Sequence, residues 1–269
     1  MNSVQNLPNL GVGIGYREPF RADLFLHRPQ IDFLEITSDH YLDATAKKNE
    51  ELELLRQHFP LIPHGLNLSL GSAEGVDEKY LEKLAALLEK LRPAWFSEHV
   101  CFTKSGGVDI GHLAPVPFTR ESLEVLKRNV FRVKEFIKTP FILENITYTL
   151  RFPFSEMDEA EFIGELVEET DCGLLLDATN LYINSVNHLY DWREFLDKLP
   201  PERIVQLHFV GSHRHDGNLL IDAHADRTED EIWNVFREVC VKSNIKGAVL
   251  ERDENFPPFS AILEEVTTA

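Results

Sequence analysis

Eight short runs of apolar residues, rich in β-branched and aromatic types, recur along the chain. They cover residues 11–16, 32–37, 61–67, 95–101, 141–146, 173–179, 204–210 and 248–253. Between them, residues 77–91, 120–137, 156–169 and 229–241 place apolar side chains at the three- and four-residue spacing of helices. We expect Thr119 and Ser155 to be helix N-caps. This alternation predicts repeated βα units and a parallel sheet.

Polar residues end almost every one of these runs, which favours a closed barrel over an open sheet. An open doubly wound sheet gathers its functional residues at one switch point, whereas a (β/α)8 barrel uses the carboxyl ends of all its strands. The chain has 269 residues and shows neither a Pro/Gly/Ser-rich linker nor an internal repeat. We therefore expect an α/β protein with one (β/α)8 TIM-barrel domain over residues 1–269.

The charge balance excludes several classes of partner. Asp and Glu number 45 against 27 Lys and Arg, which gives a formal net charge of −18 and disfavours nucleic acid and anionic membranes. Residues 1–5 lack the basic and apolar blocks of a signal peptide. No apolar run reaches the roughly 18 residues of a membrane helix. We expect a cytoplasmic protein with neither a nucleic-acid nor a membrane partner.

Two other features argue against a nucleotide-binding loop and against disulfides or a thiolate metal site. The alternating glycines of residues 11–16 never complete the G-x-G-x-x-G pattern, so they predict a tightly packed first strand rather than a nucleotide-binding loop. Cys101, Cys172 and Cys240 are odd in number and far apart, without C-x-x-C spacing. This spacing predicts reduced thiols rather than disulfides or a thiolate metal site.

Ionisable side chains at the ends of the runs are the candidate site. They are Glu35, His64, Glu98, His99, Glu144, Asp177, His208 and Glu251, and the loop after the seventh run adds Asp222 and His224. Burying so many ionisable groups together is very costly unless they are paired or bind a cation. The sequence therefore predicts a multinuclear metal site. A mixture of imidazole and carboxylate suits Fe(II), Mn(II) or Zn(II), and residue types do not choose among these.

Neighbouring residues in a strand point in opposite directions, so adjacent candidates compete. We assign His99 rather than Glu98 as a ligand. We prefer Glu144 over Asn145 because a carboxylate can bridge two cations, which leaves Asn145 beside the ligands or facing the substrate. His213 and His215 lie in a polar loop, and we assign them to the surface.

These motifs resemble the multinuclear non-haem iron oxidative enzymes typified by the methanobactin biosynthesis protein MbnB and its relatives TglH and ChrH. The resemblance covers most of the chain and is carried by residues 64–71, 97–99, 143–145, 174–177 with Asn180, 221–224 and 250–253. This chain departs from the family at two places. Gln206 stands where relatives have Glu in a Glu-x-His motif, and Asp39-His40-Tyr41 stands where many relatives have Glu-Asn-Tyr.

The resemblance implies a cofactor, a reaction and partners. The implied cofactor is two or three iron ions (Fe2+/Fe3+), with O2 as co-substrate and Glu144 as a bridge. The reaction is oxidative modification of cysteine in a ribosomally made precursor peptide, aided by a small partner protein that captures the peptide. The implied ligands are His64, His99, Glu144, Asp177, His208, Asp222, His224 and Glu251. Catalytic roles fall to Glu144, His208 and Asp177, and substrate contacts to Asn145, Asn180 and Asn67.

Three alternatives remain open at this point. A divalent-metal sugar isomerase would usually place a lysine near the substrate oxygen, and no strand end offers one. A metal-dependent phosphodiesterase or other hydrolase acting on nucleic acid would need a basic groove, which the charge of −18 opposes. A non-catalytic metal-binding protein would differ from the enzyme by showing no O2 consumption with a cysteine peptide.

Overall fold

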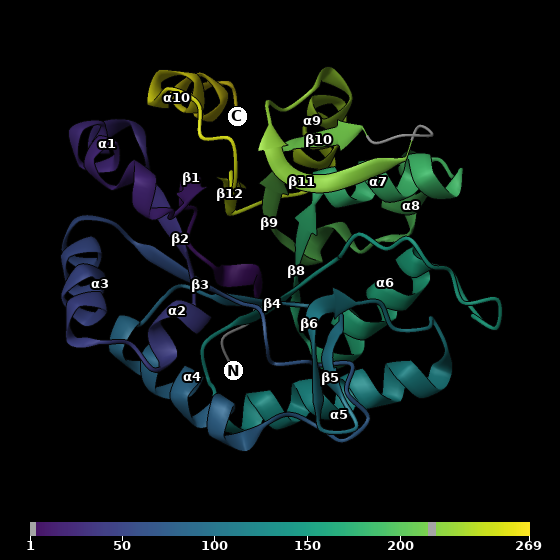
Figure 1. Ribbon diagram of the computed structural model, residues 1–269. Helices are drawn as coiled ribbons and strands as arrows, with labels where there is room; N and C mark the ends of the chain where they lie inside the picture. Colours follow the sequence, from purple (N-terminus) through teal and green to yellow (C-terminus); the bar gives the residue numbers. More distant parts are fainter. Residues whose placement is uncertain (1–3, 215–218) are drawn as a thin grey trace.

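The computed structural model describes residues 4–214 and 219–269, and its centre is a closed barrel of eight strands (Figure 1). In order around the barrel the strands are β1 (Gly11–Gly15), β2 (Phe33–Thr37), β3 (Leu61–Gly65), β4 (Phe96–His99), β7 (Phe141–Glu144), β8 (Gly173–Asp177), β9 (Ile204–Phe209) and β12 (Gly247–Leu250). Every neighbouring pair is parallel, so all eight carboxyl ends lie at one end of the barrel. The predicted (β/α)8 barrel is confirmed.

Helices surround the barrel on its outside (Figure 1). They are α1 (Arg21–Leu26), α2 (Asp39–Leu42), α3 (Ala46–His58), α4 (Glu78–Leu91), α5 (Arg120–Phe136), α6 (Glu159–Thr170), α7 (Ala178–His188), α8 (Trp192–Lys198), α9 (Asp230–Lys242) and α10 (Phe259–Thr268). Among the described residues, no helix combines the length and apolar character needed to cross a bilayer.

Two antiparallel hairpins follow β4 and β9 and therefore stand at the carboxyl end of the barrel. One pairs β5 (Phe102–Ser105) with β6 (Val108–Ala114), and the other pairs β10 (Gly211–Arg214) with β11 (Leu220–Asp226). The second hairpin lies against α7 (Figure 1). It brings Asp222 and His224, both on β11, to the end of the barrel where the other candidate ligands are found.

The beginnings of two helices test the expected caps. The Thr119 side chain accepts a hydrogen bond from the backbone N–H of Ser122 and caps α5, as expected. The expectation for Ser155 was wrong, because α6 begins three residues later than the apolar pattern suggested. Asp158 caps it and forms a capping box with Glu161, in which each side chain accepts from the other residue's backbone N–H. This reciprocal pair satisfies two backbone donors at once, which a lone serine cannot do.

A ring of apolar side chains fills the part of the barrel interior that is nearer the amino ends of the strands. Its members are Val4, Phe33, Ile62, Trp95, Ile142, Leu175, Val205 and Val249. The glycines of β1 make room for it, since a Cβ atom on Gly13 would lie only 2.9 Å from the Phe33 ring. The alternating glycines are therefore a packed strand, as the sequence predicted.

The polar site lies one layer above this ring because side chains on a strand return to the same face every second residue. Two residues beyond Phe33 stands Glu35, and the same step leads from Ile142 to Glu144. Strand β9 breaks this rule, since its register with β8 shifts: Leu174 pairs with Ile204, and Leu175 pairs with Gln206.

Candidate metal centre

Three groups of ionisable side chains meet at the carboxyl end of the barrel. Within each group, one ligand atom per residue lies within 4.8 Å of all the others. The groups are His64, His99 and Glu144; Glu144, Asp177, His208 and Glu251; and His224, Glu251 and Asp253. Glu144 and Glu251 each belong to two groups, so the three form one continuous cluster. The candidate residues come from β3, β4, β7, β8, β9 and β11 and from the end of β12.

Glu144 is the centre of this cluster. Its Oε2 lies 3.4 Å from Nε2 of His64 and 3.3 Å from Nε2 of His99. Its Oε1 lies 3.2 Å from Nδ1 of His208. The carboxylate therefore presents one oxygen to each of two histidine groups, which is the arrangement of a bridging ligand.

Glu251 links the second group to the third. Its Oε2 lies 3.1 Å from Nδ1 of His208 and 3.7 Å from Nδ1 of His224. The other ring nitrogen of His224, Nε2, lies 2.7 Å from Oδ1 of Asp222. His224 has a φ of +48°, a left-handed backbone that is uncommon for residues other than glycine. Its carbonyl accepts the backbone N–H of Asp253 at 2.9 Å, which helps to hold this conformation.

The histidines of the barrel strands are held by hydrogen bonds on the ring nitrogen that faces away from Glu144. Nδ1 of His64 lies 2.8 Å from the hydroxyl of Ser97, and Nδ1 of His99 lies 3.1 Å from the carbonyl of Gly65. On His208, Nε2 is the held nitrogen, and it lies 3.0 Å from Oε2 of Glu35. Such contacts fix the orientation of a metal-binding imidazole and leave its other nitrogen free.

Electrostatics within the cluster show how strongly these groups depend on one another. Burial lowers the pKa of His99, but the carboxylates of Glu144 and Glu98 outweigh it and raise the pKa to about 9. Burial raises the pKa of Glu144, yet the positive charges of His99 and His208 bring it down to about 2. For Asp177, burial and the neighbouring charges of Asp222 and Glu144 raise the pKa to about 7.

The remaining histidines follow the same pattern. Burial lowers the pKa of His208, but Glu35 and Glu144 outweigh it, and the pKa lies well above its usual value. His224 behaves likewise because of Asp222 and Glu251. With no cation present, the carboxylates therefore draw protons onto the histidines. Bound metal ions would replace these protons, since ligands bind metal in their deprotonated form.

Hydrogen bonding supports the fit of metal ions to this cluster. Of the buried side-chain atoms without a hydrogen-bond partner among the described residues, five belong to this cluster: Oε2 of Glu144, Oδ2 of Asp177, Nδ1 of His208, Oδ1 of Asp222 and Nε2 of His224. Buried polar atoms are nearly always satisfied in native proteins. Carboxylate oxygens and imidazole nitrogens are ligands that Fe(II), Mn(II) and Zn(II) accept. The residues present therefore fit a multinuclear metal centre.

The three asparagines have different surroundings. Asn145 brackets Asp177, since its Oδ1 accepts the Asp177 backbone N–H at 2.8 Å and its Nδ2 donates to the Asp177 carbonyl at 3.2 Å. Asn180 donates its own backbone N–H to Oδ1 of Asp177 at 2.8 Å, and its side-chain Oδ1 has no partner among the described residues. Asn67 belongs to none of the three groups; it is half-buried and donates to Oδ1 of Asp39 at 2.8 Å.

The structure also places residues that sequence reasoning left aside. Glu98 turns away from the centre, and its Oε2 accepts the backbone N–H of Leu68 at 3.0 Å. His213 is exposed beside Asp226, and His215 lies outside the described residues. Of the three cysteines, Cys101 and Cys172 are buried and Cys240 is exposed, and all are free thiols.

Sequence reasoning missed Asp253 and Arg17 as members of the site. Asp253 completes the third group, and Arg17 donates from Nε to Oδ1 of Asp253 at 2.6 Å and from Nη2 to Oε1 of Glu251 at 3.2 Å. Arg17 could have been found from its position, because it lies two residues after the end of β1 and the carboxyl ends of all eight strands surround the site. A lone arginine gave no reason to be chosen.

The role of Glu35 and Gln206 was also missed. Nε2 of Gln206 donates to Oε2 of Glu35 at 2.6 Å, and its Oε1 accepts from Nε1 of Trp95 at 2.6 Å. Glu35 in turn holds His208. Gln206 thus joins the apolar ring to the polar layer above it. Strict alternation would have placed Gln206 on the face of the strand opposite to that of its neighbour Val205, which belongs to the apolar ring.

Known proteins of similar sequence match nearly the whole chain. The chain is 34% identical over 260 residues to a UPF0276 protein of Caulobacter vibrioides, and the match covers 96% of this chain and 92% of that protein. It is 31% identical over 272 residues to a UPF0276 protein of Vibrio vulnificus, with 100% and 93% covered.

Solved structures that resemble the chain share its barrel. A putative xylose isomerase from Rhodospirillum rubrum superposes with a TM-score of 0.61 at 12% identity, and the match covers 96% of this chain and 97% of that one. Endonuclease IV from Thermus thermophilus gives a TM-score of 0.56 at 15% identity, covering 97% and 99%. At such low identity these matches show the fold alone.

A family match covers nearly the whole chain and includes the cluster. Residues 11–269 match the family described as the RiPP precursor modification enzymes MbnB/TglH/ChrH, the family that the strand-end motifs resemble. The chain therefore belongs to the MbnB/TglH/ChrH family of enzymes that modify precursors of ribosomally made peptides.

Proposed function

We propose that this protein is an iron- and O2-dependent oxidoreductase that modifies a cysteine of a ribosomally made peptide. The observation that carries the proposal is the position of Glu144, whose two carboxylate oxygens face separate histidine groups. A shared carboxylate suits chemistry that needs two adjacent metal ions. Membership of a family of peptide-modifying enzymes supplies the class of substrate.

The proposed metal ions are two or three irons. The residues that would hold them are His64, His99, Glu144, Asp177, His208, Asp222, His224 and Glu251, with Asp253 added from the geometry. When bound, iron would supply the redox chemistry that allows O2 to oxidise a cysteine thiolate. The protein would fix the positions of the metal ligands and leave room at the metal ions for the substrate and O2.

Three residues are proposed to be central to catalysis. Glu144 would be the ligand shared by two metal ions, and His208 is kept in place by Glu35. Asp177 is fixed by Asn145, which brackets its backbone, and by Asn180, whose backbone N–H binds its carboxylate. These hydrogen bonds set the geometry in advance, so that little reorganisation is needed during the reaction.

Substrate contacts are proposed for the asparagines. Asn180 is the strongest candidate, because its buried Oδ1 is left without a partner among the described residues. Asn67 is half-buried and is proposed to meet the peptide from the β3 side. Asn145 uses both amide atoms on Asp177 and would act on the substrate through that carboxylate.

Iron content provides the first test. Protein prepared anaerobically with ample iron should contain two or three irons by elemental analysis and show coupled iron by Mössbauer spectroscopy. Ample iron matters because zinc outcompetes Fe(II) on affinity alone, and anaerobic handling keeps Fe(II) from being oxidised. Protein that holds only traces of iron under these conditions would exclude the iron enzyme and leave a zinc hydrolase as the alternative.

Turnover provides the second test. We propose that a small separate protein captures the peptide, since family members commonly work with such a partner. The iron-loaded chain, that partner and a cysteine-containing precursor peptide should together consume O2 and change the mass of the peptide. A peptide with serine in place of cysteine is the control and should remain unchanged. Efficient turnover by this chain alone would contradict the need for a partner.

A further inference from the structure

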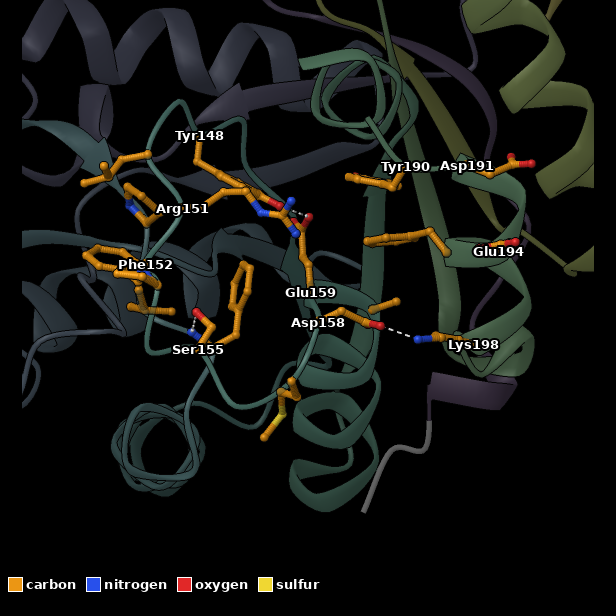
Figure 2. Close-up of a pocket in the computed structure, with 18 residues that line it drawn as sticks. Tyr148, Arg151, Phe152, Ser155, Asp158, Glu159, Tyr190, Asp191, Glu194 and Lys198 are labelled. Carbon is orange, nitrogen blue, oxygen red and sulfur yellow. Dashed lines mark hydrogen bonds and ion pairs between the residues drawn. The ribbon is translucent and has the colours of Figure 1, made fainter. Parts of the chain in front are cut away.

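A cavity lies outside the barrel, between the segment that joins β7 to α6 and the junction of α7 with α8 (Figure 2). Its volume is about 410 Å³, which is within the range of ligand-binding pockets. None of the residues that line it belongs to the three metal groups. In Figure 2, Arg151 and Phe152 stand on one side, Tyr190 and Glu194 on the other, and Glu159 between them.

Aromatic side chains form much of the wall. Phe118 and Tyr148 meet edge to face with ring centroids 5.8 Å apart, and Tyr190 stacks on Phe195 at 6.0 Å. Apolar surface continues past the cavity, because Leu150 in its lining is 61% exposed, and Phe154, whose ring centroid lies 5.6 Å from that of the lining residue Phe152, is also 61% exposed. Contiguous exposed apolar surface commonly marks a site of interaction. A ligand that covers it must therefore have an apolar body longer than the cavity itself.

One wall carries a buried carboxyl group. The Glu159 side chain is buried, and its Oε2 accepts a hydrogen bond from the hydroxyl of Tyr148 at 3.0 Å. Among the described residues, no cationic side chain forms an ion pair with Glu159. Burial raises its pKa to about 8. The hydroxyl of Tyr190, also in this wall, is buried without a hydrogen-bond partner among the described residues. A ligand with N–H donors could satisfy the Tyr190 hydroxyl and donate a further hydrogen bond to the Glu159 carboxyl.

The charged side chains that line the cavity indicate whether the ligand should be a cation or an anion. Four acidic and two basic side chains line the cavity. One of the bases, Lys198, is already paired with Asp158 and Glu161. The other, Arg151, is exposed and donates to the carbonyl of His188 at 3.5 Å. The acids are thus in excess on a chain of net charge −18, which favours a cation over an anion.

We propose that this cavity is a second binding site, which takes a segment of polypeptide in which an apolar side chain lies next to a basic one. The apolar side chain occupies the aromatic cavity, and the basic group pairs with Glu159. The exposed Leu150 and Phe154 contact the continuation of the segment, which is why a polypeptide fits better than a small amine. Because binding is measured without turnover, the result is independent of the proposed iron chemistry.

Calorimetric titration at pH 9, where the Glu159 carboxyl is ionised and lysine is still protonated, tests the site with defined probes. The probes are the peptide acetyl-Leu-Phe-Lys-Leu-amide, its analogue with neutral norleucine in place of lysine, and phenethylamine. We expect the lysine peptide to bind about tenfold more tightly than the norleucine peptide, as one ion pair in a partly closed site would give. Equal binding of the two peptides, or no binding at about 1 mM, would overturn the proposal. Phenethylamine that binds as tightly as the lysine peptide would also overturn it, in favour of a small-amine site.

Three variants locate the binding. Glu159→Gln keeps the shape and the hydrogen bond from Tyr148 but removes the charge, so the preference for lysine should vanish. Glu168→Gln makes the same change at an exposed position of α6 outside the cavity and should keep the preference. Phe152→Ala removes part of the wall and should weaken both peptides by a similar factor. A lysine preference that survives Glu159→Gln would place the binding elsewhere and sink the proposal.

Discussion

Glu144 and His208 approach to 3.2 Å between Oε1 and Nδ1, while the other oxygen of Glu144 faces His64 and His99 on the opposite side. The carboxylate thus stands between two sets of imidazoles. This relationship connects β7 with β9 on one side and with β3 and β4 on the other. It makes Glu144 the residue whose loss should affect more than one metal position.

Replacement of Glu144 by Gln should uncouple the metals. The amide keeps the shape but lacks the negative charge that two cations would share, so we expect one iron to be lost first and the coupled Mössbauer signal to disappear. The barrel should stay folded. Elemental analysis and a melting curve on the same sample separate metal loss from unfolding. Glu159→Gln, which also changes a buried carboxyl, is the matched control and should keep its full iron content. An E144Q protein with intact coupled irons would disprove the bridge.

Gln206 should stabilise both the fold and His208. Gln206→Met keeps the length of the side chain but removes both hydrogen bonds, which leaves the Trp95 N–H without its partner and leaves Oε2 of Glu35 with His208 alone. Loss of such buried partners costs about 1–3 kcal/mol, so we expect a fall in Tm of several degrees. Metal affinity should also fall because Glu35 holds His208. Calorimetry and metal titration check the two effects, and an unchanged Tm together with unchanged metal affinity would show that the network contributes nothing.

Arg17 should make metal binding weakest at the third group, which consists of His224, Glu251 and Asp253. Its guanidinium already neutralises Glu251 and Asp253, so a third cation would have to bind beside a positive charge. Anaerobic titration with Fe(II) should therefore show two tight ions and a third that binds at least about tenfold more weakly. Arg17→Gln should strengthen the third site and lower the stability of the metal-free protein. If the variant binds the third ion no better than the parent, Arg17 does not control that position.

Glu159 should make stability depend on pH. Its pKa of about 8 in the folded protein lies above the value of about 4.3 in an unfolded chain. The folded state therefore binds the proton more tightly, so stability falls as pH rises from the unfolded towards the folded pKa. Glu159→Gln removes this loss. We expect the variant to melt about 5 °C above the parent at pH 8.5 and the difference to shrink towards pH 5.5. A difference that stays constant across this range would contradict the assignment.

Much of the fold was predictable from the sequence, because apolar periodicity is a local property. The eight runs correspond to the eight barrel strands, and the polar residues that end them, such as His64 and Asp177, lie at the carboxyl end of the barrel. The family resemblance likewise rested on short motifs. By contrast, the beginning of α6 depended on the capping pair Asp158 and Glu161, whose reciprocal hydrogen bonds the apolar pattern does not record.

Along the strands that stay regular, the sequence by itself determined which side chains would face the barrel interior, since a strand returns to the same face every second residue. Only the tertiary structure decided which of them meet. Closure of the barrel brings Arg17 and Asp253, far apart in the chain, into one ion pair, and the shifted register at β9 turns Gln206 towards Trp95. Distances across a closed sheet depend on the pairing of all eight strands at once, and no local pattern carries that information.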